Sequence, residues 1–393
     1  MKFCAVICEY NPFHNGHLYQ FSEIKRADAE KILCLMSGNF TQRGEAAVLG
    51  KYVRARHAIL SGADVVLELP AAFSVGAAET FARGGVKLLS SLPCVDKLAF
   101  GCESGNAENF LKAAKATLSE DKTFKEILKE NMKDGSSYVK ARTAAVLALN
   151  TDVDEATLTS PNNILGVEYC RAILSSGGKI VPLPIGRVGS GYADTGLAKN
   201  FSSATALRTA LRDPSRKTKR LIKKNVPEYV LEDLERAPDL PFEKTALFSL
   251  LSSSAEEIAL CPDCGEGLEN RLKAMARANP SYGKALQKVV SKRYTLSRVK
   301  RILAQNLLKI RRKDVKEFLE SPLYCKVLAV KKESAEEIFS ALKEGAYPLL
   351  TRKSDALALK KTALDCFACD VRANDVYGVL SGERTNEYET LFI

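Results

Sequence analysis

Residues 3–17 of the chain are FCAVICEYNPFHNGH, and this stretch decides the fold. Its first six residues are apolar and end before Glu9, which is typical of a short buried strand. Pro12 and Gly16 mark a turn, and a helical spacing of apolar residues begins at Leu18. The stretch therefore predicts a strand, a turn and a helix, which together begin an α/β sheet.

The same alternation continues along the chain. The predicted strands are Phe3–Cys8, Lys31–Met36, Ala63–Glu68, Val95–Phe100 and Lys179–Leu183. The predicted helices are Leu18–Arg26, Lys51–Leu60, Ala77–Leu89, a largely helical stretch at 106–150, a helix after Ser160-Pro161, and Ser203–Leu211. Because strand–helix–strand crossovers are right-handed, this order predicts an α/β fold with an open, doubly wound parallel sheet of the Rossmann-like type.

The length of 393 residues allows two or three domains of roughly 100–200 residues each. We expect a catalytic α/β domain at residues 1–212 and a basic, helical domain at residues 213–315. A small C-terminal α/β unit is expected at residues 316–393, around a strand at Cys325–Val330.

Composition indicates an ordinary soluble protein, with 46% hydrophobic and 27% charged residues. The sequence has no apolar run of the roughly 20 residues that a membrane helix needs, so we expect no membrane contact. Eleven cysteines without an export signal predict reduced thiols and a cytoplasmic location. The net charge of +11 is concentrated after residue 210, which favours a polyanionic partner.

The motif His14-Asn15-Gly16-His17 carries the predicted chemistry. It follows a strand and opens a helix, where backbone N–H groups and the positive helix end favour an anion. Gly16 leaves room for a nucleotide, and the two imidazoles can donate hydrogen bonds to phosphate oxygens during phosphoryl transfer. The alternative is a turn with two exposed histidines, but two of only three histidines in the chain fall in this one motif.

A second segment, SSATALR at residues 202–208, supports the first. It places Ser203, Thr205 and Arg208 at another predicted helix start, where hydroxyl groups bind phosphate or cap the helix. Alone, this segment is equally well explained as a helix cap. Together with His14 and His17, it predicts the far wall of a triphosphate site.

These motifs resemble the HxGH nucleotidyltransferase superfamily, which includes pantetheine-phosphate and nicotinate-nucleotide adenylyltransferases and class I aminoacyl-tRNA synthetases. The usual adenylyltransferase loop has Phe-Asp before its proline, whereas this chain has Tyr10-Asn11. The chain is identified as a member of a narrower family, the bacterial tRNA(Met) cytidine acetate ligases, over essentially its whole length. The segments that carry this resemblance are MSGNFTQRGE at 36–45, DVVLELP at 64–70, FGCES at 100–104, SPNNILG at 160–166 and IGR at 185–187.

The resemblance implies ATP-dependent acetylation of the wobble cytidine in elongator tRNA(Met). Acetate would attack the α-phosphate of ATP to give acetyl-adenylate and pyrophosphate, and the cytidine amine would then take the acetyl group to give 4-acetylcytidine. ATP would be used as its Mg2+ complex, with most Mg2+ ligands supplied by phosphate and water, so no metal site is predicted in the protein.

The resemblance also implies the site residues. His14 and His17 would stabilise the transition state, with Asn11 and Arg208 as further catalytic candidates. Which of Asn162 and Asn163 contacts ATP stays open, and Asn162 could equally be a helix N-cap. From their place after the second predicted strand, Arg43 and Lys51 are candidates for phosphate or RNA, although a solvated surface position is the more common alternative. The expected ATP-binding residues are Ile7, Cys8, Glu9, Tyr10, Asn11, Pro12, Phe13, His14, Asn15, Gly16, His17, Leu18, Tyr19, Gln20, Gly101, Asn162, Asn163, Arg187, Ser203 and Thr205.

Residues 284–313 contain eleven Lys and Arg residues and no Asp or Glu. Helical spacing predicts an apolar face along 296–310, with the cations on the opposite face tracking a phosphate backbone. Tyr282 and Tyr294 are predicted stacking surfaces for unpaired bases. The alternative is a merely solvated helix face. The expected tRNA-binding residues are Arg216, Lys217, Lys219, Arg220, Lys292, Arg293, Arg298, Arg301, Lys309 and Arg312.

Two CxxC pairs, Cys261/Cys264 and Cys366/Cys369, are spaced as zinc ligands are, but they lie far apart in sequence and we expect ordinary thiols. Two other functions compete with the acetate ligase. A small-metabolite adenylyltransferase shares His14 and His17 but leaves the basic C-terminal half unexplained. A non-enzymatic RNA-binding protein has no need of both histidines.

Overall fold

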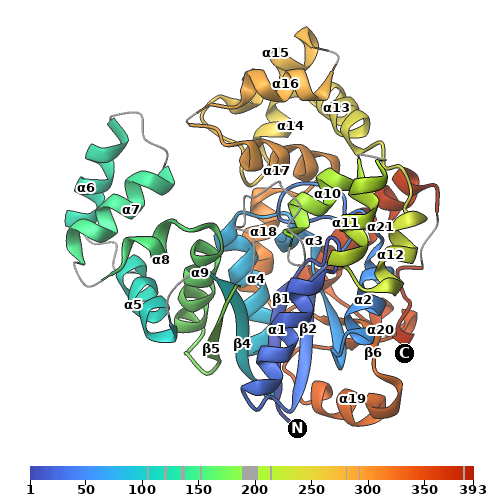
Figure 1. Cartoon of the computed structure of the whole chain (residues 1–393). Helices are drawn as coiled ribbons and strands as arrows, with labels where there is room; N and C mark the ends of the chain where they lie inside the picture. Colours follow the sequence, from blue (N-terminus) through green and yellow to red (C-terminus); the bar gives the residue numbers. More distant parts are fainter. Residues whose placement is uncertain are drawn as a thin grey trace.

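The computed structural model describes residues 1–103, 106–118, 122–133, 138–150, 153–187, 202–212, 215–279, 281–291, 293–383 and 386–393. One mostly parallel, mixed sheet crosses the molecule in the order β5-β4-β1-β2-β3-β6-β7, and β8 pairs with β6 (Figure 1). The strands are β1 (Phe3–Cys8), β2 (Lys31–Ser37), β3 (Val65–Leu69), β4 (Val95–Cys102), β5 (Val181–Gly186), β6 (Cys325–Val330), β7 (Leu349–Leu350) and β8 (Leu391–Phe392). The predicted α/β class with a parallel sheet is confirmed.

Strands β1 to β5 are mutually parallel, with β1 between β2 and β4. Chain order therefore reverses between β1 and β4, and the crevice at the carboxyl ends of these strands is where open α/β sheets bind ligands. β3 begins at Val65 rather than at the predicted Ala63, because Gly62 and Ala63 still close the preceding helix through hydrogen bonds to Ile59 and Ala58.

Both faces of the sheet are buried, because successive side chains of each strand point to opposite faces. Phe3, Ala5 and Ile7 of β1 belong to one hydrophobic cluster, whereas Cys4 and Val6 belong to the other. The second face is covered by α1 (Asn15–Arg26), α2 (Lys51–Leu60), α10 (Ala204–Leu211), α11 (Arg216–Asn225) and α12 (Glu228–Glu235).

The first face is covered by a longer set of helices, which continue into the middle of the chain. These are α3 (Ala71–Ser74), α4 (Ala78–Ser90), α5 (Ala107–Leu118), α8 (Glu155–Thr159), α9 (Pro161–Ser175), α18 (Arg312–Glu320), α19 (Ala335–Lys343), α20 (Lys353–Leu357) and α21 (Lys361–Ser381). Two more helices, α6 (Lys122–Lys133) and α7 (Tyr138–Leu149), pack on each other next to α8, away from the sheet (Figure 1). A short 3₁₀ helix, η1 (Lys332–Ser334), precedes α19.

The helical segment predicted after residue 212 contains five further helices, gathered at the top of the view (Figure 1). They are α13 (Phe242–Ser252), α14 (Ala255–Ala259), α15 (Leu268–Ala278), α16 (Tyr282–Val289) and α17 (Leu296–Leu307). Their apolar residues continue the hydrophobic cluster of the first sheet face, and Gln305 of α17 donates a hydrogen bond to the carbonyl of Val75, 2.9 Å away.

The C-terminal segment differs from the expected small α/β unit. Its strand lies at the predicted residues, Cys325–Val330, but it pairs antiparallel with β3 and so extends the sheet of the N-terminal segment. All six residues of β6 are buried. A strand that is apolar on both faces needs a cover on each, and the larger sheet supplies both covers.

Lys51, a predicted candidate for phosphate or RNA, is instead buried in an ion cluster. Its Nζ lies 2.8 Å from Glu68 Oε1 and 2.7 Å from Glu387 Oε2, and Lys326 Nζ contacts the same two carboxylates. The cluster joins α2, β3, β6 and the C-terminal tail. The prediction that Lys51 contacts phosphate or RNA was wrong. The carboxylates that neutralise Lys51 come from distant parts of the chain.

We predict that Glu68→Gln lowers the free energy of unfolding by about 3–5 kcal/mol, because two buried ammonium groups would share one carboxylate. Urea denaturation measures this change. Glu79→Gln is the matched control, because its ion pair with Arg83 is exposed and contributes about 0–1 kcal/mol. If both substitutions lowered the free energy of unfolding equally, the buried cluster would contribute no more to stability than an exposed ion pair.

Candidate active site

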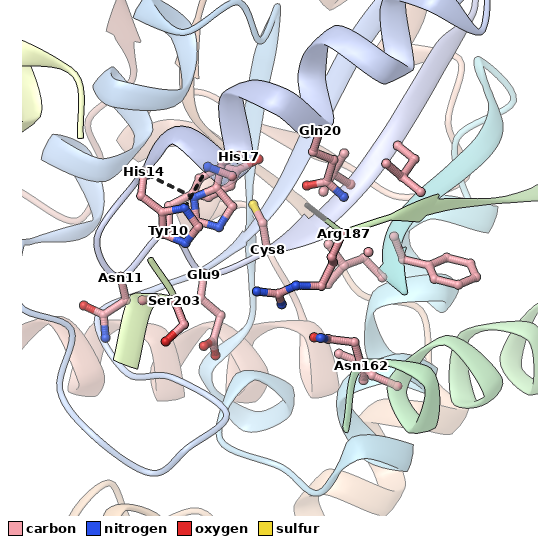
Figure 2. A pocket seen from close by; sticks show the side chains of 18 of the residues that line it. Cys8, Glu9, Tyr10, Asn11, His14, His17, Gln20, Asn162, Arg187 and Ser203 are labelled. Carbon is pink, nitrogen blue, oxygen red and sulfur yellow. Dashed lines mark hydrogen bonds between the residues drawn. The ribbon is translucent and has the colours of Figure 1, made fainter. Parts of the chain in front are cut away.

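A cavity of about 250 Å³ lies at the carboxyl ends of β1, β4 and β5, at the reversal point of the sheet. Most of the predicted site residues line it, and Figure 2 shows ten of the lining side chains labelled. The predicted residues on its wall are Ile7, Cys8, Glu9, Tyr10, Asn11, His14, Gly16, His17, Tyr19, Gln20, Arg43, Gly101, Asn162, Arg187, Ser203, Thr205 and Arg208.

Five predicted ATP-binding residues do not line the cavity: Pro12, Phe13, Asn15, Leu18 and Asn163. Phe13 is fully buried against Tyr10 and Phe21. The Asn15 side chain donates to the carbonyl of Lys224, 2.9 Å away, and so attaches α1 to α11. Phe13 and Asn15 thus support the turn without facing the cavity.

The two histidines of the motif form a reciprocal cap at the start of α1. Nδ1 of His14 accepts from the N–H of Gly16 at 3.1 Å, and Nδ1 of His17 accepts from the N–H of His14 at 3.2 Å. A neutral imidazole whose Nδ1 accepts carries its proton on Nε2. The backbone thus sets one tautomer in both rings, which stack with centroids 3.8 Å apart and leave both Nε2–H groups as donors (Figure 2).

Gly16 is required by this arrangement. A Cβ atom at residue 16 would lie 2.9 Å from Cε1 and 3.0 Å from Nδ1 of His14, closer than real Cβ contacts. Gly16 therefore leaves space for the imidazole ring of His14, and the Gly16 N–H donates a hydrogen bond to that ring.

Burial keeps both imidazoles uncharged. Desolvation, together with the nearby Arg187 and Arg208 guanidinium groups, lowers the pKa of His14 to about 3. Desolvation and the neighbouring His14 and Arg187 lower the pKa of His17 well below its ordinary value. The histidines are therefore neutral donors in the ligand-free protein, and the positive charge at the cavity comes from arginines.

Helix α10 brings Arg208 to the turn. Its Nη1 donates to the carbonyl of Asn11 at 2.7 Å, and its Nη2 donates to Thr205 Oγ1 at 3.3 Å. Ser203 caps the helix by accepting from the N–H of Ala206 at 3.1 Å, and it also lines the cavity. This segment therefore both caps a helix and forms part of the cavity wall.

The turn is held from below by a buried guanidinium group. Arg54 is fully buried, and its Nη1 donates to the carbonyls of Glu9 and Ser37 at 2.6 and 3.1 Å. Its Nε donates to the carbonyl of Leu49 at 2.8 Å, and its Nη2 donates to the carbonyl of Gly38. The loop at residues 39–48 adds two more bonds, from Gln42 N–H to Glu9 Oε1 and from Val48 N–H to Asn11 Oδ1. The side-chain oxygen of Asn11 is thus engaged in structure.

Residues of β4 and α9 form another part of the cavity wall. Gly101, the last residue but one of β4, lies next to the aliphatic part of Arg187, whose Cγ would lie 3.5 Å from a Cβ at residue 101. Asn162 lines the cavity and donates to Glu103 Oε1 at 2.5 Å. Asn163 is fully buried and is bonded to the N–H of Glu103 and the carbonyl of Ala156. Of the two, Asn162 is therefore placed to contact a ligand.

Several cavity residues were missed by the sequence analysis. They are Val6, Gln42, Phe81, Phe100, Leu165, Tyr169, Ile185, Gly186, Ser202 and Ala204. Phe100, Leu165 and Ile185 lie inside the quoted motifs, one or two residues from predicted contacts, so helix and strand periodicity within those motifs was an available signal. Phe81 and Tyr169 carry no such signal, because only the folded sheet places them there.

Comparison with known proteins agrees with this geometry. A model of the HIGH Nucleotidyl Transferase family matches residues 1–390. Over 388 residues the chain is 36% identical to the tRNA(Met) cytidine acetate ligase of Caldanaerobacter subterraneus subsp. tengcongensis, covering 96% of this chain and 95% of that protein. The chain belongs to the tRNA(Met) cytidine acetate ligase family.

Other members are similarly close. The enzyme of this name from a Geobacillus species is 37% identical over 366 residues, covering 90% of both proteins. The crystal structure of Thermotoga maritima TmcAL bound with alpha-thio ATP matches with a TM-score of 0.89 at 29% identity, and its apo form I with 0.92 at 30%, each covering 100% of both chains. The similarity therefore extends through the helical segment and the tail.

In this member of the tRNA(Met) cytidine acetate ligase family, some of the basic residues predicted to bind RNA are exposed, whereas others are buried or paired with acidic residues. Arg216, Lys219 and Arg220 are exposed on α11. Lys309, Arg293 and Arg312 are exposed as well, although Arg293 pairs with Glu266 at 3.0 Å and Arg312 donates to the carbonyls of Cys261 and Cys264. Lys292 lies outside the described residues, as do Ser104 of the FGCES motif and the side chain of Lys217.

Helix α17 does not present the open cationic face that we expected. Arg301 is buried, with Nε 2.5 Å from Asp263 Oδ2, and Arg298 donates to the carbonyl of Asp263 at 2.9 Å. Residues 301–306 are all buried, because α17 packs against α13, α14 and α16 and Gln305 reaches the carbonyl of Val75. The acids missing from residues 284–313 are supplied in space by Glu45, Asp263 and Glu266.

The aromatic prediction for this family member is also corrected. Tyr282 and Tyr294 are both buried, so neither ring is open to an unpaired base. Tyr294 instead lies under the guanidinium group of Arg298, which is 5.6 Å from the ring centroid.

All eleven cysteines are buried free thiols. Among the described residues, His, Cys, Asp and Glu side chains nowhere gather in threes as potential metal ligands. Cys366 and Cys369 lie within α21. None of the helices in the described ranges has both the length and the apolar composition that crossing a membrane requires.

We predict that His14→Gln makes stability less sensitive to acid. A pKa lowered by folding means that the unfolded chain binds the proton first, so His14 contributes stability above pH 6.5 that is lost as the pH falls towards 3. Between pH 7 and pH 5, the variant should lose about 2 kcal/mol less free energy of unfolding than the unsubstituted chain. Urea denaturation at several pH values measures this difference.

Gln20→Ala is the control for that experiment, because it alters the same cavity without removing a titrating group. It should keep the original pH dependence. Parallel pH profiles for His14→Gln and the unsubstituted chain would mean that the buried imidazole is not held neutral.

Proposed function

We propose that this chain activates acetate with ATP and transfers the acetyl group to the wobble cytidine of elongator tRNA(Met), giving 4-acetylcytidine. The observation that carries the proposal is the pairing of two neutral Nε2–H donors with Arg208 in one cavity at the reversal point of the sheet. Membership of the family over nearly the whole chain supports the same activity.

In the first step, a carboxylate oxygen of acetate attacks the α-phosphorus of ATP. The bond from this phosphorus to the bridging oxygen breaks, and pyrophosphate leaves. The Nε2–H groups of His14 and His17 donate to the phosphate oxygens as negative charge develops, while Arg208 and Arg187 offset that charge. Because both imidazoles are neutral in the free protein, the site holds no unpaired imidazolium cation before ATP binds.

In the second step, the exocyclic amine of cytidine attacks the acyl carbon of acetyl-adenylate. The bond to AMP breaks, AMP leaves, and the amine gives up a proton. The adenosine part is proposed to lie against Gly101, Asn162 and Arg187, at the end of the cavity that Phe81 and Phe100 make apolar.

We propose that Mg2+ accompanies ATP and is held mainly by phosphate oxygens and water. Glu9 is the one carboxylate among the described residues of the cavity wall, and its Oε1 already accepts the N–H of Gln42 at 2.6 Å. The donor set thus fits a metal that arrives with the nucleotide better than one held by a protein cage.

The tRNA surface is proposed to centre on α11. This helix adjoins the cavity, because Asn15 at the start of α1 binds the Lys224 carbonyl and Asn225 Oδ1 accepts from the N–H of Ser202 at 2.7 Å. Arg216, Lys219 and Arg220 extend that side with exposed cations. Arg293, Lys309 and Arg312 are proposed as outlying contacts. The boundaries at 212 and 315 and the cytoplasmic location stay predictions.

The proposed activity predicts that purified protein, ATP and isotopically labelled acetate place the label in 4-acetylcytidine of unmodified tRNA. Mass spectrometry of tRNA nucleosides measures it. His17→Ala should lower the rate at least about 100-fold, because it removes a donor aimed at developing charge. The control is His57→Gln, since this third histidine pairs with Asp233 away from the cavity. AMP appearing on a phosphorylated metabolite instead would favour the adenylyltransferase alternative.

We predict that the triple variant Arg216→Glu, Lys219→Glu, Arg220→Glu weakens tRNA binding and reduces the salt slope by about 2–3, because each phosphate contact contributes about 0.9. Acetyl-adenylate formation without tRNA should persist. The matched control reverses Lys122, Lys125 and Lys129, which are exposed on the distant helix α6 (Figure 1). Equal losses from both triple variants would refute a specific role for α11.

A further inference from the structure

The loop at residues 39–48 lies between helix α17 and the turn that carries the histidines. On the turn side, Gln42 N–H binds Glu9 Oε1 and Val48 N–H binds Asn11 Oδ1. On the helix side, Gly44 has a φ of +73°, and a Cβ there would lie 2.4 Å from the backbone nitrogen of Arg301. The loop thus touches the backbone of α17 at one end and the cavity wall at the other.

Glu45 is the charged residue of this loop that spans the two sides. Its Oε1 accepts from Lys300 Nζ of α17, and its Oε2 lies 3.9 Å from Arg208 Nε of α10. The carboxylate is mostly buried, with 26% of the side chain exposed, and its carbonyl accepts from Thr41 N–H at 3.0 Å and Oγ1 at 3.2 Å. Backbone and side-chain contacts therefore both restrict Glu45.

The electrostatic setting keeps Glu45 ionised. Burial by itself raises the pKa of this carboxyl group, but Lys300, with Arg208 and Arg43, lowers it below its ordinary value. The Glu45 carboxylate thus interacts both with Lys300 of the helical segment and with Arg208 of the cavity wall.

Glu45 lies beside the guanidinium group of Arg208, whose other contacts include Asn11 and Thr205. Its Nη1 donates to the carbonyl of Asn11 at 2.7 Å, which fixes one edge of the guanidinium group, and Glu45 approaches the Nε edge. Glu45 does not line the cavity itself. It can act on phosphate only through Arg208 or through its charge.

We propose that Glu45 is a positioning residue that orients Arg208 for acetate activation and links it to helix α17 through Lys300. This inference rests on the proposed function. Lys300 holds part of the carboxylate's charge away from Arg208, so the arginine keeps its positive field for phosphate. The geometry of α17 is thereby coupled to the strength of the nucleotide site.

The two partners of this link should have opposite effects on ATP affinity. Lys300→Met leaves the whole negative charge of Glu45 facing Arg208, so it should weaken binding of a non-hydrolysable ATP analogue by about three- to tenfold. Glu45→Gln removes a negative charge near the phosphates, so it should leave affinity unchanged or increase it. The double variant should bind as tightly as the unsubstituted chain.

Isothermal titration calorimetry with this analogue measures these affinities, and it requires no turnover. Lys244→Met is the matched control, because Lys244 is an exposed lysine of the same helical segment, and it should bind normally. If Glu45→Gln and Lys300→Met weaken binding alike, the loop is a structural support only and the proposal is overturned.

Turnover provides the second arm of the test. Glu45→Gln should lower kcat for acetate-dependent pyrophosphate release by about tenfold without raising KM for ATP, because Arg208 loses its orientation. In an Arg208→Gln background, the same substitution should change kcat less than about twofold. Additive losses would overturn the proposal. If the unsubstituted chain releases no pyrophosphate with acetate, the proposed function fails, and the affinities still decide the role of Glu45.

Discussion

The active site depends on one buried cation, Arg54. It binds backbone carbonyl groups at the ends of the neighbouring strands β1 and β2. Arg54 binds the carbonyls of Glu9, Ser37, Gly38 and Leu49, and is fully buried in doing so. A guanidinium group has five N–H donors in a rigid plane, so it fixes the directions of several carbonyls at once. The turn above Glu9 is thereby held in the position from which its imidazoles and its main chain face the cavity.

The charge at the site is divided between residues that are far apart in the chain. His14 and His17 supply directed but neutral donors, since burial lowers the pKa of each. The cations Arg187 and Arg208 enter from β5 and α10, and Arg208 is fixed to the carbonyl of Asn11. A ligand phosphate would thus meet oriented hydrogen bonds from the first turn and positive charge from the opposite wall. Such a preorganised site needs little rearrangement as charge develops.

Local features of this fold could be predicted from sequence, whereas long-range pairings could not. Strand β1, helix α2 and strand β6 lie at or within a residue of their predicted bounds, because apolar period and turn residues determine them locally. Lys51 and Arg301 were misjudged as surface cations, because Glu387 and Asp263 meet them only after folding. For the same reason, residues 284–313 contain no acidic residue, yet Glu45, Asp263 and Glu266 pair with cations of helix α17 in the fold. The cavity residues Phe81 and Tyr169 escaped notice because the sheet alone brings them to β1.

The position of β6 and Glu387 has a consequence for the order of events during translation. β6 covers the open edge of β3, and Glu387 completes the ion cluster around Lys51 and Lys326. The N-terminal part of the sheet is therefore synthesised before the strand that covers its apolar edge, and Lys51 at first has only Glu68 of its two carboxylate partners. Domains commonly fold in turn from the N-terminus as they are synthesised, but this sheet is completed only after β6 and Glu387 have been synthesised.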